Sequence, residues 1–265
     1  MPSDRGQRVR ERAATDPAAE VVHAPHPLLM QYYASEDERR DWVRAMFDSA
    51  APDYDRLEWL MAFGDGAWYR HQALLRAGLK PGLRVVDVGT GTGLLAREAV
   101  AIVGAGELVT GVDPSQGMLD HAVVPAGVRL LPGRAEELPV EDGCADFVCM
   151  GYALRHIGDL TAAFCEFHRV LQPGGVVCLL EITPPESRLG ALALKAYMKV
   201  LVPTLSRLVA RGANTPRLMR YHWDTIEACV PPARVMATLE YAGFTDVHRH
   251  VAAGIFSEYQ GRKSR

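Results

Sequence analysis

Between residues 83 and 182, short apolar segments alternate with helical patterns, and this alternation limits the possible folds more than any other feature. The apolar segments have the length and composition of buried strands, and they lie at residues 83–89, 107–113, 128–133, 144–150 and 176–182. The helical patterns between them lie at residues 94–104, 115–123 and 160–171. Strands that alternate with helices in this way predict an α/β fold, in which helices cover both faces of a parallel sheet.

A helical insert interrupts this alternation before the last two strands. Residues 184–232 are mainly apolar and helical in pattern, with scattered Lys and Arg. They precede a helix expected at residues 233–244 and strands expected at residues 245–251 and 253–262. We interpret the insert as a lid over the carboxyl edge of the sheet.

The start of the chain differs in composition from the rest. Residues 1–20 read MPSDRGQRVRERAATDPAAE, which is charged throughout and lacks the apolar stretch of a secretory signal. We therefore expect residues 1–35 to form a disordered or loosely packed arm, and residues 36–265 to form a single domain. The absence of a signal also favours a cytoplasmic protein.

The overall composition excludes several classes of protein. The chain has 265 residues, of which 48% are hydrophobic, and a formal net charge of −3. This suits one domain with a large core and gives no reason to expect nucleic acid as a partner. No uninterrupted apolar run reaches the ~20 residues that a membrane span needs. The five cysteines include no CxxC pair, which favours reduced thiols over disulfides or zinc.

The sequence VVDVGTGTG at residues 85–93 predicts a ligand-binding turn after the first strand. Gly89, Gly91 and Gly93 allow the backbone to turn sharply and to approach a ligand closely. Asp113 ends the second strand, where an acidic side chain can accept hydrogen bonds from both hydroxyls of a ribose. A glycine-rich turn alone would serve a dinucleotide equally well.

Two details favour S-adenosylmethionine over a dinucleotide. The dinucleotide pattern GxGxxG fails, because its third glycine would fall at Leu94 or at Ala96. Asp87 precedes the turn, and its carboxylate would repel a pyrophosphate but not a cationic ligand. S-adenosylmethionine has no phosphate and carries an ammonium group and a sulfonium.

Three residues after the third strand are candidates to hold the adenine of such a cofactor. Arg134, Ala135 and Glu136 offer a backbone amide and an acidic neighbour at this position. This is the edge of the sheet at which the glycine turn and Asp113 are also expected.

Several motifs together resemble a known family. The runs VDVGTGTG, GVDPSQGML, GRAEELPVEDGCADFV and HRVLQPGG resemble the class I S-adenosylmethionine-dependent methyltransferases. More narrowly, MFDSAAPDYDRLEWLMAFG, YALRHIGDL, RYHWDTIEACVPPARVMATLEYAGF and AAGIFSEYQGRK are similar to the C-methyltransferases of ubiquinone and menaquinone biosynthesis. The resemblance covers about residues 40–262 and implies a Rossmann-like, seven-stranded sheet whose last strand is antiparallel. It also implies cofactor contacts by Thr92, Asp113, Arg134, Ala135 and Gly151.

The sequence GYALRHIGDL follows the fourth strand and places polar side chains at its carboxyl end. Ligands of doubly wound sheets bind outside the carboxyl ends of the strands, so we expect Tyr152, Arg155 and His156 where the acceptor meets the donated methyl group. His156 can take the proton of a phenol, and Arg155 can stabilise the resulting phenolate. The alternative is that His156 only caps or packs the helix that begins near Asp159.

The similar quinol methyltransferases carry an Arg-Asn pair where this chain has Arg155 and His156. This departure puts a quinone-type acceptor in doubt and favours a different phenol. It also gives the chain a conventional base that the family pattern lacks.

Two further groups are candidates for the site. The resemblance places Tyr54 in a lid that closes over cofactor and acceptor, whereas an ordinary aromatic anchor of an N-terminal helix is the alternative. Tyr221, Trp223 and Glu227 lie close together in the insert and are candidates for the wall of a substrate pocket. Packing of a lid helix is the alternative there. A metal site is not expected, because no second cluster would complete the ligands.

These observations predict an S-adenosylmethionine-dependent methyltransferase that acts on a carbon of an apolar quinol or phenol. An O- or N-methyltransferase of a small secondary metabolite remains open, as does a protein that binds the cofactor without methylating. An NAD-dependent dehydrogenase is disfavoured by the broken GxGxxG and by Asp87. Lys195, Lys199 and Arg207 among apolar residues leave peripheral contact with an anionic membrane face open, and a homodimer is open as well.

Overall fold

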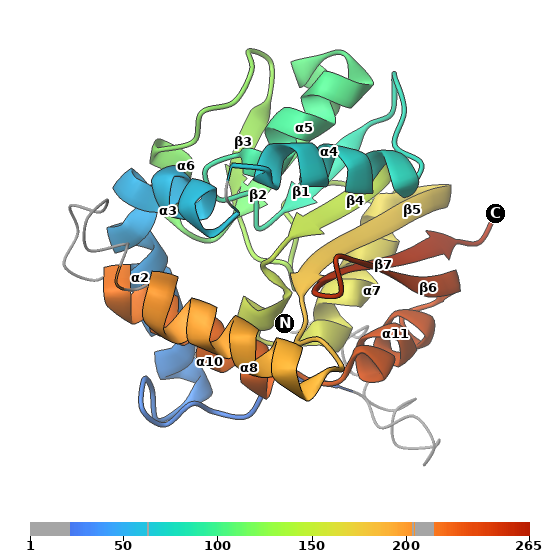
Figure 1. Ribbon diagram of the computed structural model, residues 1–265. Coiled ribbons are helices and arrows are strands. Elements are labelled where there is room, and N and C mark those ends of the chain that lie inside the picture. The colour runs from blue at the N-terminus through green and yellow to red at the C-terminus, as the bar shows by residue number, and fades with distance from the viewer. Residues whose placement is uncertain (1–21, 63, 203, 205–214) are drawn as a thin grey trace.

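The computed structural model of the protein describes residues 22–62, 64–202, 204 and 215–265. It contains a seven-stranded sheet with the order β3-β2-β1-β4-β5-β7-β6 (Figure 1). The strands are β1 (Val85–Val88), β2 (Val109–Asp113), β3 (Arg129–Pro132), β4 (Ala145–Gly151), β5 (Leu171–Ile182), β6 (Phe244–Ala252) and β7 (Phe256–Lys263). The strands β1 to β5 pair in parallel, whereas β7 runs antiparallel to β5 and β6. The predicted α/β sheet is thereby confirmed, including its antiparallel last strand.

Helices cover both faces of this sheet, as the sequence predicts. One face packs against α4 (Gly66–Arg76) and α5 (Leu94–Val103), and the other packs against α7 (Leu160–Val170) and α11 (Pro232–Tyr241). Successive side chains of a strand point to opposite faces, so Val85 joins the first core and Val86 joins the second. The near-continuous apolar strands of the sequence reflect this burial on both sides.

A third core joins the first helices of the domain to the insert. The helical segments that form it are α2 (Glu36–Ala50), η1 (Ala51–Asp53), α3 (Tyr54–Met61), α8 (Arg188–Ala196), a π-helical turn (Tyr197–Leu201) and α10 (Thr215–Ala228). Leu57, Met198, Tyr221 and Trp223 are buried together in this core. The helix α10 packs against α2, and α8 leads into the π-helical turn that packs against α10 (Figure 1). Arg207 of the insert lies outside the described residues.

Polar caps define where two important helices begin. Ser35 Oγ accepts a hydrogen bond from the backbone N–H of Glu38 at the start of α2, and the Glu38 carboxylate accepts one from the backbone N–H of Ala34. Asp159 Oδ1 accepts a hydrogen bond from the backbone N–H of Ala162 at the start of α7. Both helices therefore have fixed N-terminal ends. The remaining short helices are α6 (Gln116–Asp120), η2 (Gly106–Leu108) and η3 (Leu154–His156).

The arm expected at residues 1–35 is packed over the part that the structure describes. Residues 1–21 lie outside the described residues. Val22, His26 and Tyr33 are buried, with 6%, 1% and 3% of their surface exposed. The sequence VHAPHPLLMQYY at residues 22–33 is apolar, unlike the charged run before it. Packing against the domain therefore begins before residue 36.

Candidate active site

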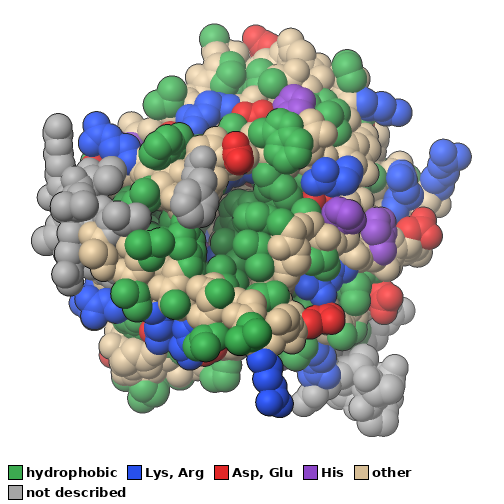
Figure 2. All heavy atoms as spheres, in the orientation of Figure 1, with side chains coloured by type: hydrophobic (Ala, Val, Ile, Leu, Met, Phe, Trp, Pro, Cys, Tyr) green, Lys and Arg blue, Asp and Glu red, His purple; other side chains and the backbone are tan. Residues whose placement is uncertain are grey.

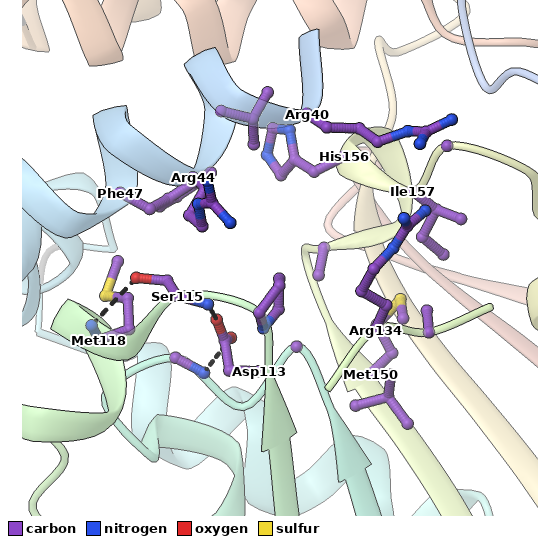
Figure 3. A pocket seen from close by; sticks show the side chains of 18 of the residues that line it. Arg40, Arg44, Phe47, Asp113, Ser115, Met118, Arg134, Met150, His156 and Ile157 are labelled. Carbon is purple, nitrogen blue, oxygen red and sulfur yellow. Dashed lines mark hydrogen bonds between the residues drawn. The ribbon is translucent and has the colours of Figure 1, made fainter. Parts of the chain in front are cut away.

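A cavity of ≈ 380 Å³ lies at the carboxyl ends of β1, β2 and β4. Figure 3 shows residues of α2, among them Arg44 and Phe47, on one side of the cavity, and Asp113, Ser115 and Met118 on the opposite side. This is the position at which ligands bind to open α/β sheets. The surface view is hollowed near its centre, where the exposed side chains are hydrophobic (Figure 2).

The cavity brings together most of the predicted site residues. Those that line it are Tyr54, Gly89, Gly91, Asp113, Arg134, Ala135, Glu136, Gly151, Tyr152 and His156. Of the residues that the structure describes, the wall does not include Asp87, Thr92, Gly93, Arg155, Tyr221, Trp223 and Glu227.

The glycine turn brings the backbone itself to the cavity. Gly89 and Gly91 have φ angles of 67° and 55°, which L-residues with side chains rarely adopt. The backbone N–H groups of Gly89 and Thr90 both donate to the carbonyl oxygen of Val112, at 2.8 and 3.1 Å. These bonds tie the turn to the end of β2.

Asp113 is fixed by two backbone hydrogen bonds on the wall of the cavity. Its Oδ2 accepts from the N–H of Gly91 and its Oδ1 from the N–H of Ser115, both at 2.8 Å. Burial raises the pKa of Asp113 to about 6, although the two hydrogen bonds oppose this shift. The ionised carboxylate keeps further lone pairs, with which it can accept hydrogen bonds from the hydroxyls of a ribose.

Three residues, Asp87, Thr92 and Gly93, support the glycine turn but do not line the cavity. Asp87 is completely buried and accepts a hydrogen bond of 2.7 Å from Thr90 Oγ1, and burial raises its pKa to about 7. The Thr92 hydroxyl donates to Asp55 of α3, and Gly93 starts α5 in a left-handed conformation. The prediction that the Asp87 and Thr92 side chains face the cofactor is therefore not matched by their positions, because each has a partner inside the protein.

Two carboxylates of the first helices accept hydrogen bonds from the turns after β1 and β2. Asp48 Oδ1 of α2 accepts hydrogen bonds from Ser115 Oγ at 2.5 Å and from the N–H of Gly117 at 2.9 Å. Asp55 accepts from Thr92 and also pairs with Arg97 at 3.2 Å. These contacts link α2 to the turn after β2, and α3 to the turn after β1.

Glu136 connects the loop after β3 to the loop after β4. Its Oε1 accepts hydrogen bonds from the backbone N–H groups of Gly158 at 2.8 Å and Asp159 at 3.3 Å, and it pairs with Arg134 at 3.1 Å. Glu136 thus lines the cavity, but its Oε1 holds protein groups. Ala135 and Arg134 also line the cavity on this side.

His156 lines the cavity from η3 and is held among aromatic rings. Its ring lies 5.1 Å from that of Phe47 and 5.5 Å from that of Tyr221, and its Nδ1 is 3.4 Å from the Tyr221 hydroxyl. Its Nε2 is buried without a hydrogen-bond partner among the described residues. Burial, and then the charge of Arg155, hold the pKa of His156 well below its usual range. The imidazole is therefore neutral at physiological pH.

Arg155 does not face the cavity, contrary to the sequence prediction. Only 1% of it is exposed, and its Nε donates to Glu181 Oε1 at 2.8 Å. Its two terminal nitrogens donate to Thr225 Oγ1 at 2.7 Å and to the carbonyl oxygens of His222 and Tyr152 at 3.2 and 3.3 Å. The guanidinium is thereby occupied in joining η3 to β5 and α10.

Two tyrosines line the cavity near a buried arginine. Burial raises the pKa of the Tyr54 hydroxyl to about 12, so this group stays protonated. Tyr152 has a φ of 61°, and the guanidinium carbon of Arg70 lies 5.4 Å from the centre of its ring. A left-handed conformation is strained for a residue with a side chain, and such strain is concentrated at functional sites.

The aromatic cluster of the insert belongs to the third core and not to the cavity. Tyr221 and Trp223 are 0% and 2% exposed and pack with Met46 and Leu57. Glu227 accepts from Trp223 Nε1 at 3.1 Å and pairs with Lys195 at the surface. The prediction that these residues form the wall of a substrate pocket is therefore wrong for this cavity, and packing of a lid helix describes them.

Residues of α2 are the main part of the site that the sequence reading missed. Arg40, Val43, Arg44 and Phe47 line the cavity. The i, i+3, i+4 and i+7 spacing of these residues places them on one face of the helix. That spacing was a usable signal, but it mixes Arg with apolar residues and so resembles neither a core face nor a solvated face.

A substitution in the glycine turn tests whether the cofactor closely approaches the backbone there. We expect Gly89→Ala to lower both stability and cofactor affinity, because a Cβ at residue 89 would lie 2.6 Å from the Cβ of Ala153. Gly143→Ala is a matched control, since Gly143 also has a positive φ (63°) but no heavy atom within 4 Å of the added Cβ. Both variants carry strain of about 1–3 kcal/mol, and only Gly89→Ala should weaken binding of S-adenosylhomocysteine in calorimetry. Equal affinities of the two variants would contradict this reading.

The wall fits S-adenosylmethionine better than a phosphate-bearing ligand. It combines a carboxylate at the end of β2, a floor of bare glycine backbone, and apolar side chains that include Met118 and Phe47. The carboxylates suit hydroxyls and an ammonium group, and the backbone permits close contact. Its volume lies within the usual range of small-molecule sites.

Comparison with solved structures agrees with this fold. A Thermotoga maritima protein described as an S-adenosylmethionine-dependent methyltransferase, possible histamine N-methyltransferase, matches with a TM-score of 0.58 at 23% identity, over 83% of this chain and 99% of that one. Phosphoethanolamine N-methyltransferase 2 of Haemonchus contortus, solved with phosphomonomethylethanolamine and S-adenosylhomocysteine, matches with a TM-score of 0.59 at 18% identity, over 88% and 61% of the two chains. At these identities the likeness shows a shared fold.

Two relatives found by sequence have a higher identity to this chain than these two solved structures. The chain is 34% identical to the ubiquinone/menaquinone biosynthesis C-methyltransferase UbiE of Syntrophotalea carbinolica, over 84% of this chain and 94% of that protein. It is 29% identical to the demethylmenaquinone methyltransferase of Staphylococcus aureus, over 88% and 97% of the two chains. A family model of ubiE/COQ5 methyltransferases matches residues 33–263. The predicted activity and cofactor are confirmed: the protein is an S-adenosylmethionine-dependent methyltransferase, and it belongs to the ubiE/COQ5 methyltransferase family.

Proposed function

We propose that this enzyme methylates a ring carbon of an apolar quinol or phenol. The observation that carries the proposal is that the Asp113 turn and the loop at residues 151–158 line one cavity. A cofactor held at the first can thus present its methyl group to an acceptor held at the second. The names of the relatives from Syntrophotalea carbinolica and Staphylococcus aureus support a quinol as the acceptor.

The cofactor is bound, in this proposal, by groups of three loops. Asp113 accepts hydrogen bonds from the ribose hydroxyls, the backbone at Gly89, Gly91 and Gly151 lies against the rest of the cofactor, and Ala135 with Arg134 borders the adenine. S-adenosylmethionine supplies an electrophilic methyl group on a positively charged sulfur. Asp87 and Thr92 support the turn by the internal hydrogen bonds described above.

His156 is the residue that acts on the acceptor in this proposal. In the tautomer that donates from Nδ1 to the Tyr221 hydroxyl, the unpartnered Nε2 is an acceptor. It can then take the phenolic proton, which makes the ring carbons more nucleophilic. Because Arg155 is bound to Glu181, its part is to hold η3 and not to touch the phenolate.

Label transfer tests the proposed reaction directly. Purified enzyme is mixed with methyl-labelled S-adenosylmethionine and a pre-reduced lipid extract that contains demethylated quinols, and the labelled product is located by mass spectrometry. Label on a ring carbon is the expected result. Label on oxygen or nitrogen would favour a different methyl acceptor, and cofactor binding without label on any phenol would revive a protein that binds the cofactor without methylating.

Tyr54 gives a narrower test of the acceptor side. We expect Tyr54→Phe to lower kcat about fivefold, because Tyr54 lines the cavity and one hydrogen bond contributes roughly 1 kcal/mol. Tyr197→Phe serves as a control, since Tyr197 is a hydroxyl donor to the carbonyl oxygen of Met61 away from the cavity wall. Both rates are measured at saturating cofactor. An unchanged rate for Tyr54→Phe would assign Tyr54 to packing.

Contact with a membrane surface is a second part of the proposal. No helix in the described part of the chain is long and apolar enough to cross a membrane. However, Leu189, Leu192 and Val200 of α8 and the following π-helical turn are 80%, 64% and 63% exposed. An apolar helix face with nearby lysines suits docking on anionic lipid, where an apolar acceptor would be found. Co-sedimentation with anionic vesicles, lost in Leu189→Ser/Leu192→Ser, is the expected result; binding to no vesicle would exclude it.

A further inference from the structure

Residues 22–27, which we call the N-terminal strap, run along the loop that carries His156. The carbonyl oxygen of His23 accepts a hydrogen bond of 2.7 Å from the backbone N–H of Leu160, and that of Val22 accepts one of 3.1 Å from Thr161 Oγ1. His23 Nδ1 lies 2.8 Å from Asp159 Oδ2, the carboxylate of the residue that caps α7. The strap is thereby bound to the C-terminal end of the loop.

The strap is also anchored on the other side. The carbonyl oxygen of Pro25 accepts a hydrogen bond of 2.7 Å from the N–H of Val230, in the connection between α10 and α11. His26 is only 1% exposed, and its Nε2 lies 3.1 Å from the carbonyl oxygen of Arg155. Burial lowers the pKa of His26 to about 4, so the ring is neutral and stays inside the protein. The strap is therefore part of the folded domain.

Arg39 of α2 connects the strap to the loop. It is 2% exposed, and its Nη2 donates to the carbonyl oxygens of Arg155 at 3.2 Å and Ile157 at 3.0 Å, while lying 3.4 Å from His26 Nε2. These two carbonyl groups flank His156 in the sequence. Nη2 carries two hydrogens, so it can donate to both carbonyl oxygens at once. Arg39 therefore fixes the backbone on each side of the residue that lines the cavity.

The Asp113 turn, on the cofactor side of the cavity, has separate supports. Asp113 is held by Gly91 and Ser115, and Asp48 holds the turn that follows. None of these contacts involves the strap or Arg39. A change in the strap should therefore reach the loop of His156 and leave the Asp113 turn in place.

We propose that Arg39 and the N-terminal strap position the His156 loop for methyl transfer. Arg39 is a positioning residue here, and the segment that precedes α2 belongs to the acceptor half of the site. The inference rests on the proposed role of His156. It assigns a function in the reaction to residues that composition places in an arm.

Two truncations and two substitutions test the proposal. A variant that lacks residues 1–27 loses the strap, whereas one that lacks residues 1–21 retains it and is the matched control. Arg39→Met removes the donors and keeps an apolar stem, and Arg39→Lys keeps the charge and a donor nitrogen on a shorter side chain. We expect loss of the strap, or Arg39→Met, to lower kcat about 10- to 100-fold. Arg39→Lys should recover part of that loss, and the control truncation should turn over normally.

Two readouts separate positioning from general stability. Calorimetry with S-adenosylhomocysteine should give dissociation constants within about twofold of the full chain for folded variants. Hydrogen exchange should become faster at the amides of residues 154–160 and stay unchanged at residues 89–93 in the variants without the strap or with Arg39→Met. Exchange that rises equally in both segments, or a fall in cofactor affinity that matches the fall in kcat, would overturn the proposal.

A double substitution completes the test. If Arg39 acts through His156, Arg39→Met should lower kcat little further in a His156→Ala background, because the positioned side chain is already absent. Fully additive losses would overturn the inference. If His156→Ala turns over at the wild-type rate, the proposed role of His156 fails and the positioning inference fails with it. If His156→Ala shows the expected fall in kcat but the variant without the strap is fully active, only the positioning inference fails.

Discussion

Replacing Asp113 with alanine is expected to raise the dissociation constant for S-adenosylmethionine about 100-fold, because hydrogen bonds to a charged acceptor contribute roughly 1.5–3 kcal/mol each. In the proposed cofactor site, alanine removes the acceptor of both ribose hydroxyls. It also leaves the backbone N–H groups of Gly91 and Ser115 without the carboxylate that now accepts from them. Calorimetry with S-adenosylhomocysteine measures the effect, and circular dichroism confirms that the variant is folded. An unchanged affinity would remove Asp113 from the cofactor site.

The same carboxylate predicts how cofactor affinity depends on pH. Burial raises the pKa of Asp113 to about 6, so the group is ionised at pH 8 and mostly protonated at pH 5. The ionised form is the better acceptor, and affinity should therefore fall as the pH drops through about 6. Asp87, whose pKa burial raises to about 7, titrates nearby. Asp113→Asn cannot titrate at this position, so its cofactor affinity should depend less on pH. The difference between its pH profile and that of the wild type gives the contribution of Asp113.

Replacing His156 with alanine is expected to lower kcat about 100-fold, within the range that one general base contributes. Affinity for S-adenosylhomocysteine should stay near normal, because the Asp113 turn does not depend on this ring. The pKa of His156 lies well below its usual range through burial and the charge of Arg155. The ring is therefore neutral at physiological pH, and the pH profile of kcat should show no inflection near 6.5 that depends on His156.

A second histidine supplies the control for this prediction. His168 of α7 packs its ring edge-on against Phe244, 5.3 Å away, and burial also lowers its pKa. His168→Ala should leave kcat unchanged. His156→Asn is informative in another way, since the resemblance described for the sequence implies asparagine at this position in the similar quinol methyltransferases. Turnover by His156→Ala at the wild-type rate would assign His156 to packing alone.

The fold could be predicted because its signals are local. Buried strands read as continuous apolar runs, and the turn chemistry of residues 89–93 follows directly from its glycines. The antiparallel last strand came from the family resemblance and not from periodicity. The boundary of the arm was misplaced, although the apolar run from Val22 to Tyr33 carried a signal that the charged residues before it obscured.

The site was predicted less completely, because its details depend on partners far apart in the sequence. Arg155 was placed at the correct strand end, but its guanidinium binds Glu181 of β5 and Thr225 of α10. The sequence placed Tyr221 and Trp223 close together in the insert, but it did not show that α2 would pack against them. Which face of a helix meets a cavity is decided by tertiary packing, and a single sequence does not specify that packing.

The carboxylates of Asp48 and Asp55 have a consequence for the exchange of spent cofactor. They bind the helices on one side of the cavity to the turns on the other side. A molecule enclosed between these layers leaves when they separate, so its residence time depends on how often both contacts break. We therefore expect these two contacts to lengthen the time for which S-adenosylhomocysteine stays bound, while the chemical step still limits steady-state turnover.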